Sequence, residues 1–159
     1  MIQTYFQAEK YGGFWSMAIG ILACSVGGGI MLSAGAPFYT GVAIPLVVIG
    51  IVQIMVGARV ARRSDLQADD LVKLCRDSPA EFRRLEGLRM QNVLRNFVRI
   101  KWVEVAFIVL GLAIILVNKD LNFTKGLGAG LFAQGAIMLF FDFFAEKRGK
   151  AYAEFVQNQ

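Results

Sequence analysis

Four polar side chains lie within long apolar stretches of this sequence, and they are its first candidates for chemistry: Gln53, Glu104, Gln134 and Asp142. A polar or ionisable side chain inside a membrane segment is costly, so it usually has a partner or a function. The two glutamines lie deepest in their stretches. We therefore expect Gln53 and Gln134 to join helices through side-chain hydrogen bonds, each worth about 1 kcal/mol.

The two carboxylic acids stand near basic residues at the ends of these stretches. Glu104 follows Lys101 closely, and Asp142 shortly precedes Arg148. Charged side chains near the end of a span reach the membrane interface at little cost. We therefore predict interfacial ion pairs, and no proton relay in mid-membrane. The partners expected for the two acids are Arg99, Lys101, Arg148 or water at the level of the headgroups.

The sequence contains no other recognisable catalytic machinery. It has no histidine, which is the commonest general base. Its two cysteines, Cys24 and Cys75, do not form a CxxC redox pair. It also has no Gly-rich phosphate loop, metal-ligand spacing or nucleophile beside a base. We therefore predict a protein that is not an enzyme and that has no cofactor and no metal site.

Four apolar runs carry the candidate residues, and their composition sets the fold class. The chain of 159 residues is 56% hydrophobic and 18% charged, whereas charged residues make up roughly a quarter of an average soluble domain. The runs cover 14–36, 41–58, 102–117 and 126–141, and each can cross ~30 Å of hydrocarbon. The first is longer than the apolar core of a signal peptide, so we interpret it as a span. The predicted fold class is all-α: an integral membrane protein with four transmembrane helices in two hairpins.

The segment 59–101 is the only long polar stretch, and it lies between the two predicted hairpins. It holds eleven of the seventeen Lys and Arg residues. Ser78, Pro79 and Glu81 fit the N-cap, first and third positions of a capping box, which predicts that a helix begins there. We expect that helix to continue into the third span over about forty residues, a length of roughly 60 Å. Together with an earlier helix over 64–76, it predicts a cytoplasmic helical hairpin.

The basic residues also predict the orientation in the membrane. Lys and Arg favour the cytoplasmic side of a bacterial inner membrane, so we predict that both termini are cytoplasmic. The net charge of +5 is explained by this topology, and no nucleic-acid partner is predicted. Five arginines are expected to set the topology or to bind lipid headgroups: Arg59, Arg62, Arg63, Arg95 and Arg99. The predicted regions are an interfacial N-terminus (1–13), hairpin 1 (14–58), the cytoplasmic hairpin (59–101), hairpin 2 (102–144) and a cytoplasmic tail (145–159).

Small residues recur every four positions in the first span: Ser16, Gly20, Cys24 and Gly28. This spacing places them on one helical face, where another helix can approach closely. Packing against the second span of the same chain is favoured over an external partner, because small-residue stripes are the ordinary interface between membrane helices.

A weak internal repeat relates the two predicted hairpins. A shift of 85 residues sets the second span over the fourth and aligns Gly41 with Gly126, Leu46 with Leu131 and Gly50 with Gly135. Two hairpins that enter from the same side form a parallel repeat about an axis along the membrane normal. The small number of identities leaves duplication and coincidence both open.

Two classes of function fit this layout. The first is a non-enzymatic membrane protein that binds another protein within or beneath the bilayer. In span count, size and short outer loops, the chain resembles the small four-span immunity proteins that protect bacteria from pore-forming colicins and related toxins. No sequence motif carries that resemblance, so it assigns a role to no residue. It implies that the partner is a toxin in the inner membrane.

The second class is a small channel or transporter. One four-helix unit is too thin to enclose much of a pathway, so this function requires a homo-oligomer. The expected partners are therefore membrane lipids together with another membrane protein, a toxin or further copies of the chain.

Overall fold

Four long helices make up the computed structural model, which describes residues 1–33 and 35–158. They are α1 (Ile2–Ser33), α2 (Pro37–Asp77), α3 (Pro79–Val117) and α4 (Phe123–Gln157). Each contains a stretch that is long and apolar enough to cross a membrane. The all-α class with four candidate spans is confirmed. Residue 34 of the first predicted run and residue 159 of the predicted tail lie outside the described part.

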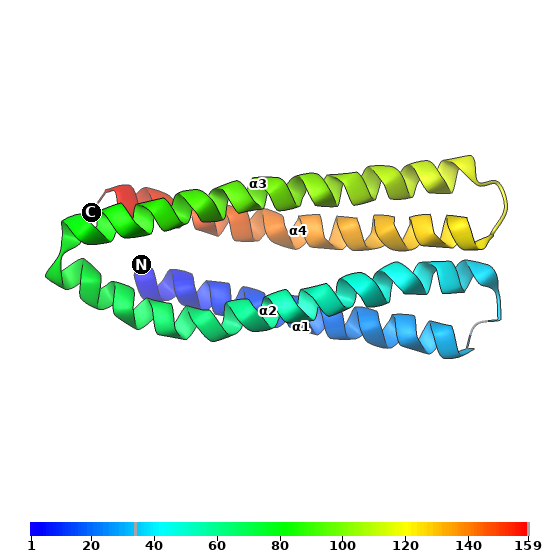
Figure 1. Cartoon of the computed structure of the whole chain (residues 1–159), viewed down its shortest axis with the longest axis horizontal. Helices are drawn as coiled ribbons and strands as arrows, with labels where there is room; N and C mark the ends of the chain where they lie inside the picture. Colours follow the sequence, from blue (N-terminus) through cyan, green and yellow to red (C-terminus); the bar gives the residue numbers. More distant parts are fainter. Residues whose placement is uncertain (34, 159) are drawn as a thin grey trace.

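The helices run back and forth along one long axis (Figure 1). α1 packs mainly against α2, and α3 packs mainly against α4. α2 and α4 pack against each other between these pairs, whereas the backbones of α1 and α3 do not approach each other closely within the described residues. The order across the molecule is therefore α1, α2, α4, α3, and each outer helix has one principal neighbour.

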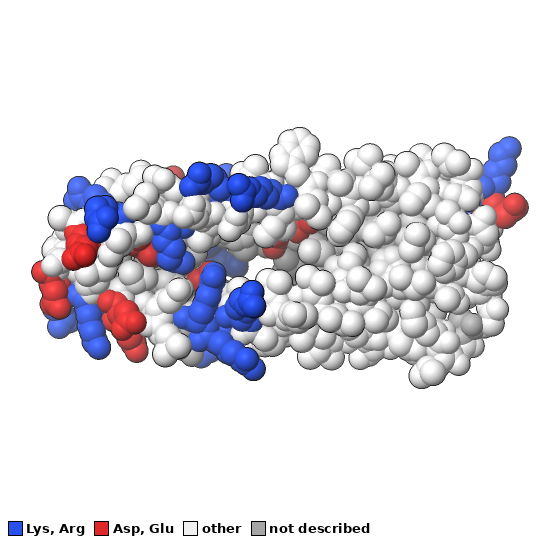
Figure 2. Space-filling view, in the orientation of Figure 1, with Lys and Arg blue, Asp and Glu red and all other residues white. Residues whose placement is uncertain are grey.

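Charge divides the molecule along its length (Figure 2). Lys, Arg, Asp and Glu gather over the end that holds both termini and the connection between α2 and α3, and the other end has few charges. We call residues 1–13, 59–101 and 145–158 the charged half, and residues 14–58 and 102–144 the apolar half. The 41 residues of α2 extend about 60 Å, which is roughly twice the thickness of a bilayer's hydrocarbon core.

The break between α2 and α3 lies where the sequence predicts it. α2 continues without interruption through its arginines to Asp77, Ser78 is the N-cap of α3 and Pro79 is its first residue. The 39 residues of α3 match the expected length. The predicted capping box is wrong in one respect, because the Ser78 side chain makes no capping hydrogen bond.

All four helices contribute to one hydrophobic core in the charged half. Its buried members come from α1, α3 and α4: Ile2, Tyr5, Phe6, Phe82, Met90, Tyr152, Ala153 and Val156. Partly buried residues of α2, among them Leu71 and Val72, pack against them. Residues 2–13 are the first turns of α1. The segments 1–13, 59–101 and 145–158 thus share one core, although the sequence suggested three separate regions.

A seam of small residues joins α1 to α2. A Cβ atom on Gly20 would lie 2.5 Å from the carbonyl oxygen of Gly50, and one on Gly13 would lie 2.7 Å from that of Gly57. About two helical turns after Gly20, Gly27 of α1 faces the carbonyl of Ala43 in the same way. Any larger side chain at these positions would push the helices apart, so glycine permits this close approach.

The tightest contacts of the seam recur every seven residues, whereas three of the four residues predicted at a spacing of four also contact α2 and the fourth, Gly28, does not. Gly20 lies in the seam, the Ser16 hydroxyl donates to the Gln53 carbonyl at 3.1 Å, and Cys24 Sγ lies 3.6 Å from the Val47 carbonyl. A Cβ atom on Gly28 would meet nothing within 4 Å. Residues four apart in an α-helix are rotated by about 40° from one another around the axis, whereas residues seven apart are rotated by only about 20° and so stay on one face.

α3 and α4 form a second seam of the same kind. A Cβ atom on Gly111 would lie 2.6 Å from the carbonyl oxygen of Gly128, and one on Gly128 would lie 2.8 Å from that of Gly111. Gly135, seven residues after Gly128, faces the backbone carbonyl of Glu104 at 3.0 Å. The two helix pairs therefore use the same packing device.

The shift of 85 residues also relates contacts between α2 and α4. Gly41 faces the carbonyl of Phe123, and Gly126 faces the carbonyl of Phe38. Phe38 and Gly41 of α2 correspond to Phe123 and Gly126 of α4 under this shift, so the two contacts are equivalent. Gly50 and its counterpart Gly135 likewise occupy matching places in their seams.

Candidate functional site

A pair of carboxyl groups lies in the apolar half at its border with the charged half. Glu104 of α3 is 0% exposed. Its carboxyl group meets that of Asp142 on α4, and no donor among the described residues hydrogen-bonds to its two buried oxygens. The sequence singled out both acids but predicted ion pairs at the interface for them.

Lys101 forms its ion pair with an acid other than Glu104. Its ammonium group forms an ion pair with Glu146 of α4, which also binds Lys150 at 2.8 Å. Hydrogen bonds from Lys101 and Lys150 hold the pKa of Glu146 below its ordinary value. The expected pairing of Lys101 with Glu104 is thus replaced, because Glu104 points between the helices while Lys101 remains partly exposed.

The other basic candidates lie on the surface of the charged half. Arg148 approaches Gly12 of α1, where an added Cβ atom would lie 3.5 Å from its guanidinium. Arg63 binds Glu9 at 3.0 Å and so ties α2 to α1. The five arginines predicted to contact headgroups are all exposed: Arg59, Arg62, Arg63, Arg95 and Arg99. Their contact with lipid stays a prediction.

The two glutamines are buried, and three of their side-chain polar atoms lack the hydrogen bonds expected of them. Gln53 is 6% exposed and Gln134 is 1% exposed. The side-chain oxygen of Gln53 and both polar atoms of the Gln134 amide have no hydrogen-bond partner within the described chain. Only the backbone carbonyl of Gln53 bridges two helices, through Ser16.

A buried polar cluster in the core of the charged half escaped the sequence analysis. Arg89 donates two hydrogen bonds to Glu86, at 2.6 and 2.7 Å, and its guanidinium lies 5.1 Å from the centre of the Phe6 ring. The rings of Tyr5 and Tyr152 stack with their centres 4.0 Å apart. Burial raises the pKa of Tyr5 to about 12, and burial likewise raises that of Tyr152.

A helical period would have revealed Glu86. Phe82, Glu86 and Met90 follow one another every four residues and are all buried. Leu85 and Ile100 of the same helix are also apolar, but they are 41% and 43% exposed. Large apolar residues four positions before and four positions after a charged residue indicate that the charged residue lies on the buried face of its helix.

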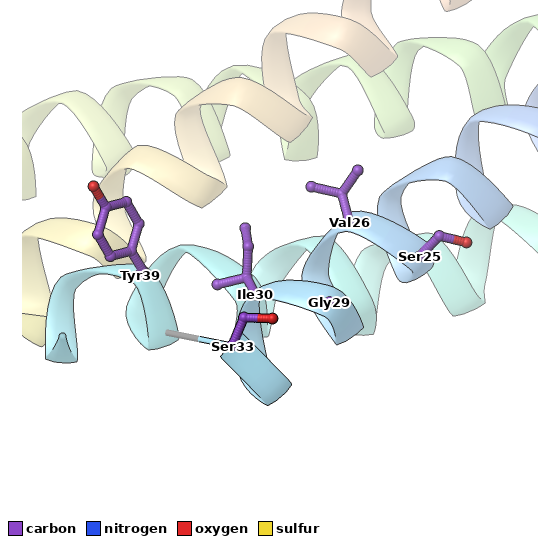
Figure 3. A pocket seen from close by; sticks show the side chains of 6 residues that line it. All are labelled: Ser25, Val26, Gly29, Ile30, Ser33 and Tyr39. Atoms are coloured by element: carbon purple, nitrogen blue, oxygen red, sulfur yellow. The ribbon is translucent and has the colours of Figure 1, made fainter. Parts of the chain in front are cut away.

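The apolar half also has a surface hollow of about 420 Å³ (Figure 3). It is lined by Ser25, Val26, Gly29, Ile30, Ser33 and Tyr39. Its polar groups are hydroxyls, and no charged side chain lines it.

No protein-family model, curated protein or solved structure matches this chain. Among the side chains described in 1–33, 35–64 and 66–158, no three from His, Cys, Asp or Glu lie close enough to hold a metal ion. The geometry of the chain itself is therefore the basis for a proposal about function.

Proposed function

We propose that this chain is a non-enzymatic, multi-pass protein of the bacterial inner membrane that binds another protein within or beneath the bilayer. The supporting observation is the exposed apolar surface of the two outer helices. Each has one principal neighbour, and large side chains such as Leu22 and Leu110 are 64% and 55% exposed. Monomeric proteins rarely expose contiguous apolar surface of this extent to water, and in a bilayer it can meet lipid or another helix.

The proposed orientation places the charged half in the cytoplasm and lets α1–α2 and α3–α4 cross the membrane as two hairpins. On the far side, only short connections project, and the one between α3 and α4 covers 118–122. A partner is then met inside the bilayer or from the cytoplasm. An inhibitor of a pore-forming toxin fits this requirement, because such a toxin acts within the same membrane.

Site-specific cross-linking in native membranes tests this function. A photoreactive residue at Leu22 or Leu110 should give a discrete cross-link to a different protein, because both side chains face outward. Leu121 is 72% exposed in the far-side connection and serves as the matched control, which should give no such product. Cross-links to lipid alone from Leu22 and Leu110 would contradict the proposal.

A small oligomeric channel or transporter is the second candidate, and one observation favours it. The enclosed contact between Glu104 and Asp142 resembles the buried acids that mark ion and proton pathways in membrane proteins. Flux across liposomes that contain the purified chain tests this candidate. A pH-dependent flux that Asp142→Asn abolishes would support it, and the absence of flux in the unchanged chain would remove it.

A further inference from the structure

The acids Glu104 and Asp142 occupy positions of the α3–α4 seam. Glu104 lies seven residues before Gly111, and Asp142 lies seven residues after Gly135. Both therefore continue a row that otherwise consists of glycines. In the α1–α2 seam, the corresponding positions are glycines: Gly20 faces Gly50 as Glu104 faces Gly135, and Gly57 lies 85 residues before Asp142. The two carboxyl groups thus stand where α3 and α4 meet, with Glu104 fully buried and Asp142 partly buried.

The charged groups described around this pair are bound to other residues or exposed to solvent. Lys101 of α3 is the basic group that acts on Glu104, and it is already bound to Glu146. Glu146 of α4 adds a further negative charge near Asp142. At the neighbouring level of α2, Arg59 and Arg62 are exposed, and neither acts on either carboxyl group. From α1, Glu9 is engaged by Arg63 of α2.

Two carboxyl groups in contact cannot both be ionised in an enclosed site, because like charges repel and burial disfavours each charge. The stable alternative is one proton between them, with the O–H of one acid donating to an oxygen of the other. Glu104 fits this arrangement especially well, since both its oxygens are buried and no other described donor reaches them.

We propose that Glu104 and Asp142 form a proton-binding site that holds one proton between them at neutral pH. When the proton leaves, two negative charges face each other in the seam, and α3 and α4 separate at this level. The site does not depend on whether the chain acts by binding a protein or by conducting ions. It differs from the predicted ion pairs, in which both acids would be ionised.

Infrared spectroscopy of the full chain in lipid nanodiscs tests this site. At neutral pH, the spectrum should contain the carbonyl band of one protonated carboxyl group per chain, and raising the pH should remove it. Glu104→Gln should abolish the band. Asp142→Asn should leave a protonated Glu104 whose band has a shifted frequency, because its neighbour has changed. Glu154→Gln, which alters an exposed acid of α4, is the control and should leave the band unchanged.

Three results would overturn the proposal. The first is a spectrum of the unchanged chain without a protonated carboxyl band at neutral pH, a result that needs no variant to fold. The second is a band that survives Glu104→Gln at full intensity. The third is loss of the band when sodium ions are added at constant pH, which would identify a monovalent cation as the ligand.

Discussion

Glu146 binds the two lysines that the neighbouring acids would otherwise attract. It lies one helical turn after Asp142 and accepts Lys101 from α3 and Lys150 from α4. Glu146 therefore joins α3 to α4 beside the carboxyl pair, on the side of the charged half. The sequence singled out Lys101 for an ion pair but expected Glu104 as its partner, because the packing of α3 against α4 that brings Glu146 to Lys101 is not visible in the sequence.

The stabilisation by Glu146 should depend on pH. Lys101 and Lys150 lower the pKa of Glu146 below its ordinary value of 4.5, so its contribution is present above that value and disappears as the pH falls through the lowered pKa. We expect Glu146→Gln to destabilise the chain by about 1 kcal/mol at neutral pH. Unfolding followed at several pH values should show this difference vanish in acid, while Glu154→Gln has no effect. A difference that is constant with pH would contradict this assignment.

The buried pair of Glu86 and Arg89 should be costly to break on one side. Glu86 is 1% exposed, and Arg89→Met would leave its charge without a partner. Because Arg89 retains some exposure, we expect a loss of about 2 kcal/mol, below the 3–5 kcal/mol of fully buried pairs.

The double variant Glu86→Leu with Arg89→Met removes both charges and should recover most of that loss. Denaturant unfolding of the four proteins of this cycle measures the coupling between the two residues. If the double variant were less stable than Arg89→Met alone, the pair would not be acting as a unit.

At the scale of the helix, the sequence predicts the four apolar spans and the start and length of α3, but it does not predict how far α1, α2 and α4 extend beyond their spans or which faces pack. Pro79 after Ser78 marks a helix start through local backbone chemistry, which needs no knowledge of neighbours. The face of α1 depends on how α2 lies against it. Gly13, Gly20 and Gly27 form the seam, but a sequence with glycine at 12, 13, 20, 27, 28 and 29 permits several stripes, and only tertiary packing selects among them.

Two glycines of α1 provide a matched test of the seam. Gly20→Leu places a side chain against the backbone of Gly50, whereas Gly28→Leu places one in open space. We expect Gly20→Leu to cost about 1–3 kcal/mol, as overpacking does in tight interiors, and Gly28→Leu to cost little. Thermal unfolding in detergent compares them. Equal stability of both variants would show that the seven-residue seam does not hold α1 to α2.

At the scale of the whole molecule, the shared hydrophobic core of the charged half is the feature that the sequence did not predict. Its core joins Phe6 near one end of the chain to Tyr152 near the other and to Phe82 in the middle. No local pattern contains such contacts, because they connect segments separated by seventy or more residues. The division into charged and apolar halves was predictable, since it follows from the positions of the charges along the chain.

Reporter fusions test the proposed membrane orientation. Fusions at the N-terminus, at the C-terminus and near Ala68 should all report the cytoplasm, because these sites lie in the charged half and basic residues favour that side. A fusion near Asn122, in the connection between α3 and α4, should report the opposite side. Any signal from Ala68 that matches Asn122 would show that the helices cross the membrane differently.

Binding to a foreign protein is the central functional claim, and the mass of the intact complex tests it most directly. The chain would be purified from native membranes in mild detergent, and its complex weighed without dissociation. The proposal predicts one chain of 17.5 kDa together with a different protein in fixed stoichiometry, lost when Leu22 and Leu110 are both replaced by lysine. A symmetric assembly of this chain alone would contradict the proposal and favour a channel or transporter.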